Sequence, residues 1–306
     1  MFSRLSRSSK IERILVVSLS NIGDVVLTLP VVDALRAAFP SAELHLIVGL
    51  KARGLFVENP HLTRVIAYDK QAPWPARLAW FLGLRRVRFD LVVDLRNSML
   101  PVLLNAGTVT RPVCSPAKVH MKDKHLARLG LVLDGPGGPS PRSGIVLSAS
   151  QRASVDRLVR GWRAYALVAP GAADPRKRWD VQGFVDVVGH LRSKGRQVIL
   201  VGDEKDRPAA ARIAAAFSEG VLDLCGGTSL IELAGVVAGS AFAVTNDSGT
   251  MHLASYFDKP VIALFGYTDP FFYGPWSARS VVLRKGTDIA SISSEDVIAE
   301  VDKFLC

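Results

Sequence analysis

Short apolar runs alternate with longer, helix-like segments along the whole chain of 306 residues. The apolar runs have the length and β-branched composition of buried strands, and the intervening segments are long enough for helices. A parallel strand pair needs a crossover connection, which is usually a helix, so this alternation predicts an α/β fold with parallel sheets. Apolar residues make up 49% and charged residues 22% of the chain, as is typical of a globular protein.

The alternation runs twice, on either side of a Gly- and Pro-rich stretch at residues 133–143. In the first half, we expect strands at 13–19, 43–48, 64–67 and 91–94, and helices at 23–38, 51–57, 76–84, 98–106 and 122–129. In the second half, we expect strands at 165–169, 197–201, 222–224, 242–245 and 261–265, and helices at 149–160, 181–193, 207–217, 229–238, 251–257 and 294–305. We therefore predict two α/β domains, residues 1–140 and 141–306, whose parallel sheets face a central cleft.

The charge and the cysteine content of the chain indicate which kinds of partner it binds and in which cellular compartment it resides. The formal net charge of +10 (38 Lys and Arg against 28 Asp and Glu) favours an acidic partner, such as phosphates, nucleic acid or an anionic membrane surface. No aromatic-interleaved basic stretch supports nucleic-acid binding. The three cysteines, Cys114, Cys225 and Cys306, are far apart and show no disulfide or metal-ligand spacing, which favours a reducing cytosol.

Membrane contact is expected to be peripheral at most. No apolar run approaches the length of about 20 residues that a span needs. The first residues carry Arg4, Arg7, Lys10 and Arg13 among serines, without the apolar region of a signal peptide. We expect a cytoplasmic protein with a frayed basic tail, and contact of that tail with the cytoplasmic face of the inner membrane stays open.

The most informative local pattern lies between the expected strands at 242–245 and 261–265. Asp247 falls at the carboxyl end of a strand, where open α/β sheets bind ligands. Ser248 and Gly249 follow at the start of a helix, which presents free N–H groups to an anion, and His252 lies on its first turn. The pattern predicts a site for an anionic ligand such as a nucleotide diphosphate. An ordinary turn with Asp or Ser as the helix N-cap is the alternative.

Three other strand ends carry polar or small residues. Asp24 follows the first strand, on the first turn of a helix, and is either a general base or a partner of the helix dipole. Gly171 and Ala172 allow close approach of a phosphate, with Lys177 nearby to neutralise it; a solvated basic loop is the alternative. Glu204 could accept hydrogen bonds from ribose hydroxyls, or be a surface carboxylate.

Five segments with this order and spacing resemble glycosyltransferase family 9, whose best-known members are the ADP-heptose:lipopolysaccharide heptosyltransferases. They are Ser20-Asn21-Ile22-Gly23-Asp24-Val25, Pro170-Gly171-Ala172, Lys177-Arg178-Trp179, Gly202-Asp203-Glu204 and Asn246-Asp247-Ser248-Gly249-Thr250-Met251-His252. The segment Phe265-Gly266-Tyr267-Thr268-Asp269-Pro270 resembles the next element of the family, in which Pro often stands where this chain has Tyr267.

The resemblance implies a GT-B fold of two Rossmann-like domains, an N-terminal acceptor-binding domain and a C-terminal nucleotide-sugar donor-binding domain. It implies an inverting, metal-independent transfer of a heptose from ADP-heptose to a lipopolysaccharide core or related glycan, with no cofactor. The implied general base is Asp24. The implied donor-binding residues are Gly171, Ala172, Lys177, Glu204, Asp247, Ser248, Gly249 and His252.

The acceptor site is less well marked in the sequence. Arg96 follows the strand at 91–94, Lys118 and His120 form a second basic group, and Ser20 and Asn21 precede the expected base. We take these five residues as candidates for contact with an anionic glycolipid or glycan acceptor. Two alternatives stay open: a GT-B enzyme with a different nucleotide sugar, and a nucleotide-binding GT-B protein without catalysis. An oxidoreductase is disfavoured because no G-x-G-x-x-G opens either half.

Overall fold

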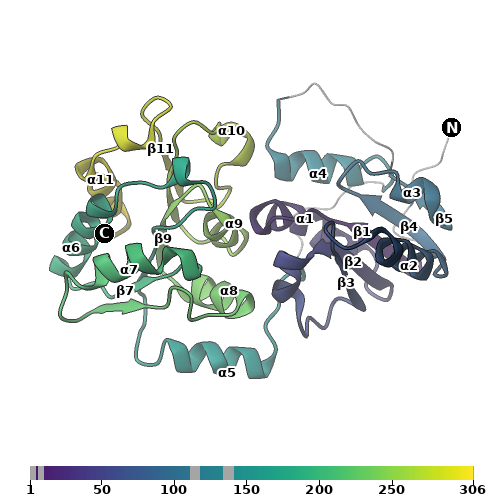
Figure 1. Ribbon diagram of the computed structural model, residues 1–306, viewed down its shortest axis with the longest axis horizontal. Helices are drawn as coiled ribbons and strands as arrows, with labels where there is room; N and C mark the ends of the chain where they lie inside the picture. Colours follow the sequence, from purple (N-terminus) through teal and green to yellow (C-terminus); the bar gives the residue numbers. More distant parts are fainter. Residues whose placement is uncertain (1–4, 6–9, 111–117, 134–140, 306) are drawn as a thin grey trace. The chain divides into compact units, whose positions relative to one another are not determined.

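The computed structural model describes Leu5 and residues 10–110, 118–133 and 141–305. The chain divides into two compact units, Met1–Ser148 and Ala149–Cys306. Each unit is built on its own parallel sheet (Figure 1). The predicted α/β fold with two parallel sheets is therefore confirmed.

Unit 1 is built on a five-stranded sheet with strand order β3-β2-β1-β4-β5. The strands are β1 (Arg13–Val17), β2 (Glu43–Gly49), β3 (Arg64–Tyr68), β4 (Phe89–Asp94) and β5 (Ala106–Val109). All neighbours are parallel, and Val17 of β1 pairs with Asp94 of β4. The carboxyl ends of β1 and β4 thus lie side by side at one edge of the sheet.

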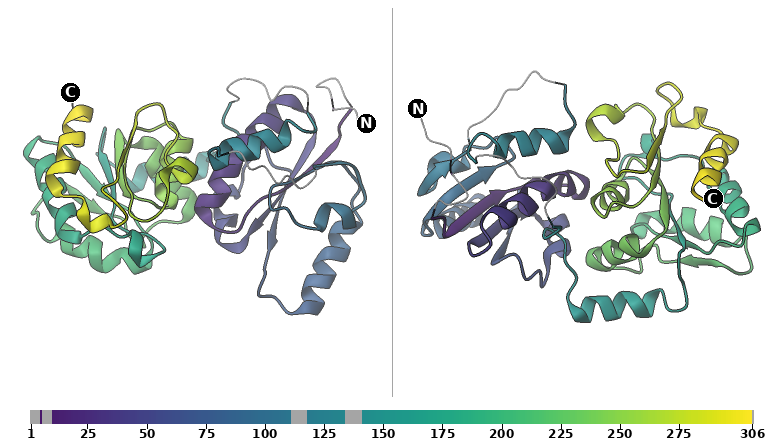
Figure 2. Two further views of the ribbon diagram at one scale, coloured as in Figure 1. Left: turned by 90° about the horizontal axis from the view of Figure 1, so that it is seen from above. Right: turned by 180° about the vertical axis from the view of Figure 1, so that it is seen from behind.

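The helical elements of unit 1 are α1 (Ile22–Ala38), the 3₁₀ helix η1 (Leu50–Phe56), α2 (Trp74–Arg85), α3 (Leu100–Leu103) and α4 (Met121–Leu129). Helices α1 and α4 pack against each other (Figure 2). Leu84 of α2 and Leu104, just after α3, belong to one apolar cluster with Leu15 and Val17 of β1. Helices α2 and α3 therefore cover the same face of the sheet.

Unit 2 contains a six-stranded sheet with strand order β11-β10-β9-β6-β7-β8. The strands are β6 (Ala166–Ala169), β7 (Val198–Leu200), β8 (Val221–Asp223), β9 (Phe242–Asn246), β10 (Val261–Leu264) and β11 (Ser280–Leu283). Their register is parallel throughout. The carboxyl ends of β6, β9 and β10 are consecutive in the sheet, which brings together the loops after these three strands.

The helices of unit 2 are α5 (Ala149–Leu158), α6 (Val181–Ser193), α7 (Arg207–Ala214), α8 (Leu230–Gly239), α9 (Gly249–Tyr256), α10 (Pro270–Tyr273) and α11 (Ser294–Leu305), with 3₁₀ helices η2 (Pro175–Lys177), η3 (Glu204–Asp206) and η4 (Ile289–Ser291). Phe184 of α6, Val244 of β9 and Val297 of α11 share the main core of this unit. Helix α5 packs on α8, which in turn packs on α9.

The secondary structure predicted from the sequence is wrong mainly at the edges of the two sheets. The helix expected at 98–106 is wrong: α3 is a short helix, and β5 follows it. Strand β5 was missed because it is a short edge strand containing Gly107, where a Cβ would lie 3.0 Å from the Asp90 carbonyl. The edge strand β11 was also missed, and α7 ends three residues before the expected 217.

Residues 143–144 are hydrogen-bonded to unit 1. This explains why unit 1 extends to Ser148, beyond the domain boundary expected at residue 140. The Asp33 carboxylate accepts hydrogen bonds from the backbone N–H groups of Ser143 (2.7 Å) and Gly144 (2.8 Å). The Asn59 amide donates to both of their carbonyls at 2.9 Å. These four hydrogen bonds are buried, so the chain leaves unit 1 only beyond them.

Several sequence expectations concern residues outside the described part. Arg4 and Arg7 of the basic tail, most of the Gly- and Pro-rich stretch, Cys114 and Cys306 lie there. Cys225 is buried and free. Within the described ranges, no helix is both long and apolar enough to cross a membrane. The cytoplasmic location stays a prediction.

Buried His125 on α4 makes the stability of unit 1 depend on pH. The residue is 3% exposed, and neither ring nitrogen has a hydrogen-bond partner among the described residues. Burial, followed by the charges of Arg128 and Lys124, lowers the pKa of His125 from 6.5 to about 4. The native ring thus stays neutral, whereas the unfolded chain takes up a proton as the pH falls below 6.5.

We therefore expect stability to fall as the pH drops from 6.5 toward 4, by up to about 3 kcal/mol from this residue. Replacement of His125→Leu should remove most of that loss, because leucine fills the site without titrating. Urea unfolding of both proteins at about pH 7 and about pH 5 measures the difference. An equally steep loss in the leucine variant would contradict the assignment.

Candidate active site

Asn246 joins the ends of two neighbouring strands in unit 2. It is the last residue of β9 and is fully buried. Its amide nitrogen donates to the Pro170 carbonyl at 2.7 Å, and its amide oxygen accepts from the Trp179 N–H at 3.2 Å. Both ends of the loop after β6 are therefore fixed against β9, which sets the position of Lys177 within that loop.

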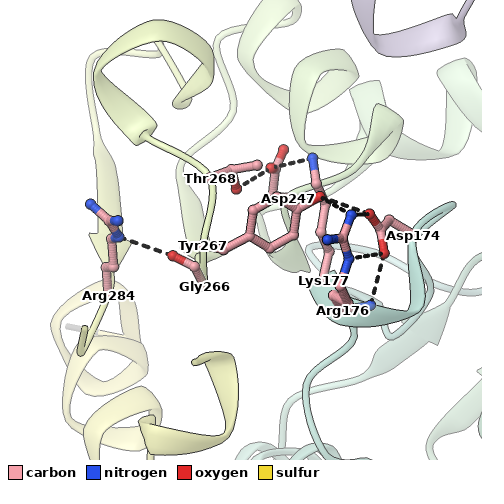
Figure 3. A network of polar contacts seen from close by, with 8 residues as sticks. All are labelled: Asp174, Arg176, Lys177, Asp247, Gly266, Tyr267, Thr268 and Arg284. Atoms are coloured by element: carbon pink, nitrogen blue, oxygen red, sulfur yellow. Dashed lines mark hydrogen bonds and ion pairs between the residues drawn. The ribbon is translucent and has the colours of Figure 1, made fainter. Parts of the chain in front are cut away.

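The loops after β6, β9 and β10 meet at the carboxylate of Asp247 (Figure 3). Its Oδ2 accepts from Lys177 Nζ and from the Thr268 hydroxyl, both at 2.7 Å. The Asp247 side chain is only 5% exposed, whereas that of Lys177 is 24% exposed. A buried carboxylate needs such partners, and the ammonium has three donor protons. Lys177 can therefore keep Asp247 and still meet an anion on its exposed side.

A second polar group lies beside this one and is also drawn in Figure 3. Arg176 donates to both oxygens of Asp174, with Nη2 2.7 Å from Oδ2 and Nε 3.1 Å from Oδ1. The Tyr267 hydroxyl donates to the same Oδ2 at 2.7 Å. The hydrogen bonds from Arg176 and then Tyr267 hold the pKa of the Asp174 carboxyl well below its usual range.

Tyr267 lies against the cations of the loop after β6. The Arg176 guanidinium stands over its ring, 4.4 Å from the centroid, and Lys177 Nζ is 6.0 Å from the same centroid. The negative face of an aromatic ring attracts such cations. The family that the sequence resembles often has Pro at position 267. In this chain, the Tyr267 side chain at that position fixes Arg176 and borders Lys177.

Gly171 makes room for a buried carboxylate beneath the loop after β6. A Cβ on Gly171 would lie 2.0 Å from Oδ2 of Asp206, and one on Gly202 would lie 2.8 Å from the same atom. Asp206 pairs with Arg178 at 3.2 Å and accepts from the Asp203 N–H at 3.0 Å. The glycine at 171 is therefore required by packing within unit 2.

Helix α9 begins without a side-chain cap. Ser248 occupies the N-cap position, but its side chain makes no capping hydrogen bond. Its hydroxyl oxygen is buried and has no partner in the described part of the chain. The alternative of an ordinary Asp or Ser cap is therefore not what the structure shows. The N–H groups of a first turn without such a cap suit an anion.

The other expected donor residues of unit 2 lie around this helix start and at the end of β7. His252 is 5% exposed, and its ring stacks on Trp276 with centroids 5.7 Å apart. Ala172 is buried, and its carbonyl accepts from Arg178 Nε. Glu204 begins η3, with its side chain 71% exposed and 3.2 Å from Arg207. Glu204 is thus free to turn toward a ligand.

In unit 1, the loop between β1 and α1 carries the expected base. The Asn21 amide donates to Asp24 Oδ2 at 3.0 Å, and Asp24 is half-buried on the first turn of α1. A Cβ on Gly49 would lie 2.8 Å from the Ser20 Cα, so Ser20 packs directly on the end of β2. The structure thus brings Ser20, Asn21 and Asp24 together at the carboxyl edge of the sheet.

The neighbouring loop after β4 is shaped by Asp94. Its carboxylate accepts from the N–H groups of Arg96 and Ser98, and its carbonyl accepts from buried Arg128 of α4. These bonds leave the Arg96 side chain over the ring of Tyr68, 5.6 Å from the centroid. Because β1 and β4 are adjacent, Arg96 lies at the same sheet edge as Asp24.

The two remaining acceptor candidates precede α4. Lys118 is exposed. His120 is the N-cap of α4, where its Nδ1 accepts from the Lys122 N–H at 3.2 Å. Helix capping therefore already accounts for His120.

Comparison with known proteins shows which family has this fold and these motifs. The sequence model of glycosyltransferase family 9 (heptosyltransferase) matches residues 108–298, more than half of the chain. The chain belongs to glycosyltransferase family 9. The resemblance in its motifs is thus confirmed, and the protein is a glycosyltransferase.

Individual relatives match this glycosyltransferase over most of its length. Lipopolysaccharide heptosyltransferase 3 of Escherichia coli is 26% identical over 335 residues, covering 92% of this chain and 96% of the relative. The solved family 9 structure from Veillonella parvula superimposes with a TM-score of 0.85 at 22% identity, covering 99% and 98%. E. coli heptosyltransferase WaaC with ADP gives 0.81 at 20% identity, covering 95% and 99%. These likenesses establish the GT-B fold.

Several residues that shape the candidate site were not singled out from the sequence. Asn246, Thr268, Asp206 and Arg176 each make side-chain contacts that shape it. Polar residues at the ends of β9 and after β10 were a usable signal for Asn246 and Thr268, since strand ends meet at one edge. The contact of Asp206 with Gly171 carried no local signal. Among the described residues, no group of three or more His, Cys, Asp or Glu is placed to hold a metal.

Replacement of Gly171→Ala should displace Asp206 and with it the loop that carries Lys177. We expect a loss of roughly 1–3 kcal/mol in stability, as for overpacking. Gly189→Ala on α6 is the matched control, because its Cβ would meet only ordinary contacts at 3.7 Å. Alanine is also the better helix former by about 0.5–1 kcal/mol. Thermal unfolding measures both variants, and equal behaviour of the two would contradict the packing argument.

Proposed function

We propose that this glycosyltransferase transfers a heptose from ADP-heptose to a lipopolysaccharide core or related glycan, with inversion and without a metal ion. The observation that carries the proposal is the helix start of α9 without a side-chain cap, beside the partly exposed ammonium of Lys177. The names of relatives supply the substrate class: lipopolysaccharide heptosyltransferase 3 on the acceptor side, and WaaC solved with ADP and with ADP-2-deoxy-2-fluoro heptose on the donor side.

The donor half of the proposal belongs to unit 2, which we take as the nucleotide-sugar domain. The first-turn N–H groups of α9, from Gly249 onward, and Lys177 would bind the diphosphate. Glu204 would accept from ribose hydroxyls, and His252, stacked on Trp276, would line the sugar end. Fixed dipoles and a cation aimed at the leaving diphosphate stabilise the charge that develops on it. This supply of positive charge supports a transfer without a metal.

The acceptor half belongs to unit 1. Asp24 would take the proton from an acceptor hydroxyl as its oxygen forms a bond to the anomeric carbon. The bond from that carbon to the phosphate oxygen breaks, and its electron pair leaves with ADP. Attack opposite the leaving group inverts the anomeric configuration. Ser20, Asn21 and Arg96 lie at the same sheet edge as Asp24 and would contact the acceptor.

Replacement of Asp24→Asn keeps the size of the side chain but removes the base. We expect turnover to fall by about 10²–10⁴-fold, the usual contribution of a general base, with ADP affinity changed by less than about threefold. The assay follows sugar transfer from ADP-heptose in the presence of EDTA. Asp123→Asn, on the exposed side of α4, is the control and should leave turnover unchanged. Near-normal turnover in the Asp24 variant would remove the base assignment, and a loss of wild-type activity in EDTA would contradict metal independence.

Replacement of Lys177→Ala should weaken ADP binding by about 1–3 kcal/mol, roughly 5- to 150-fold, because a charged hydrogen bond to the diphosphate is lost. The variant also leaves Asp247 without its cation, so Lys177→Ala with Asp247→Asn is measured beside it. Lys194→Ala, exposed at the end of α6, is the control. Calorimetry with ADP, UDP and GDP gives the affinities. Equal ADP affinity in all four proteins, or selective binding of UDP or GDP, would overturn the donor assignment.

A further inference from the structure

Helix α2 presents an unusual outer surface for a helix that packs on a sheet. Its inner side is formed by Trp80, Phe81 and Leu84, which pack on the cluster of unit 1. Its outer side carries Trp74, Leu78 and Leu82, which are 74%, 45% and 47% exposed. A spacing of four places these three side chains in one row along the helix. An apolar row in this position is not needed for packing within unit 1.

Basic residues flank this apolar row. Arg85 lies three residues after Leu82 and is exposed, as are Arg77, Arg86 and Arg88. From residue 70 to residue 89 the chain contains five basic residues and no acidic one. The two nearest carboxylates in sequence are Asp69 and Asp90. Against the five basic residues they leave residues 69–90 with a net charge of 5 − 2 = +3, so positive charge is in excess around the row.

The outer side of α3 extends the exposed apolar surface. Leu100 packs inward on the same cluster as Leu84, whereas Met99, Val102 and Leu103 are 68%, 71% and 52% exposed. Helices α2 and α3 cover one face of the sheet (Figures 1 and 2). Their outer sides therefore belong to one surface of unit 1. We call Trp74, Leu78, Leu82 and Arg85 the α2 face.

We propose that the α2 face binds to the surface of an anionic lipid bilayer. A Trp and two Leu in a row flanked by arginines match the chemistry of an interfacial helix, whose apolar side enters the headgroup region while its cations meet anionic lipid. A second copy of this chain is a poorer occupant, because facing two such surfaces would bring like charges together. A polyanion without acyl chains would leave the apolar row uncovered.

The α2 face is linked to the loop that we assign to the acceptor. Arg96 stands over the ring of Tyr68, and that ring contacts Trp80 of α2 with centroids 5.0 Å apart. The Trp80 indole N–H also donates to the Ala67 carbonyl at 3.1 Å. A bilayer bound at α2 would thus lie beside Arg96, where a lipid-linked acceptor would arrive; this purpose, but not the binding itself, rests on the proposed function.

Cosedimentation with phosphatidylcholine vesicles, with and without phosphatidylglycerol, tests the proposal on the full chain. We expect binding that needs phosphatidylglycerol and weakens with salt. Joint replacement of Trp74→Ser, Leu78→Ser and Leu82→Ser should weaken it at least tenfold, as should Arg85→Gln with Arg86→Gln. The controls are Leu131→Ser with Val282→Ser, and Arg160→Gln with Arg163→Gln, which remove exposed apolar and basic side chains elsewhere. Both controls should bind vesicles as the wild type does.

Three outcomes would overturn the inference: no binding of the wild type to anionic vesicles, equal binding of α2 variants and controls, or a wild-type dimer that the triple serine variant dissociates without any vesicle binding. Circular dichroism and thermal unfolding verify that each variant is folded. Sugar transfer to a lipid-free core oligosaccharide, measured separately, should be unchanged in the α2 variants. Vesicle binding that follows the α2 face, in a protein that transfers no heptose, would leave this inference standing and defeat the proposed function instead.

Discussion

The buried carboxylate of Asp247 is the interaction on which the candidate donor site depends. It accepts from Lys177 and Thr268, which come from the loops after β6 and β10, while Asp247 itself follows β9. Three neighbouring strand ends are therefore held by one side chain. Removing a partner from a buried charge typically costs several kcal/mol, since the charge stays without compensation. The position of Lys177 is for this reason a property of the fold of unit 2 and not of a mobile loop.

The same arrangement leaves the start of α9 available to a ligand. Ser248 makes no side-chain cap, although it stands at the N-cap position. The buried Ser248 hydroxyl and the first-turn N–H groups of α9 lie beside a cation. Backbone N–H groups in such a setting are suited to bind an anion. Tyr267 adds to it from the loop after β10, because it holds Arg176 close to Lys177. The cations and the helix start thus come from segments about 70 residues apart in sequence that follow neighbouring strands of the sheet.

The sequence predicted most of the strands and the family, and its failures have physical reasons. Buried central strands such as β1 and β9 are visible as apolar runs, and all the central strands were predicted. Of the four edge strands, β3 and β8 were predicted, whereas β5, which contains Gly107, and β11 were missed. The candidate donor-binding residues Lys177, Asp247 and Ser248 were expected from the sequence motifs. Their partners were harder to predict, because the contact of Asp206 with Gly171 depends on how two loops pack. Leu78 and Leu82 were expected only as part of the helix at 76–84, which did not include Trp74, and their exposure could not be read from periodicity alone.

The central claim is that the donor diphosphate binds at the start of α9 beside Lys177. A crystal structure of the protein with ADP tests it most directly. The account predicts diphosphate oxygens within hydrogen-bond distance of the first-turn N–H groups of α9 and of Lys177 Nζ, with the ion pair to Asp247 retained. ADP bound elsewhere in unit 2, or in unit 1, would contradict it.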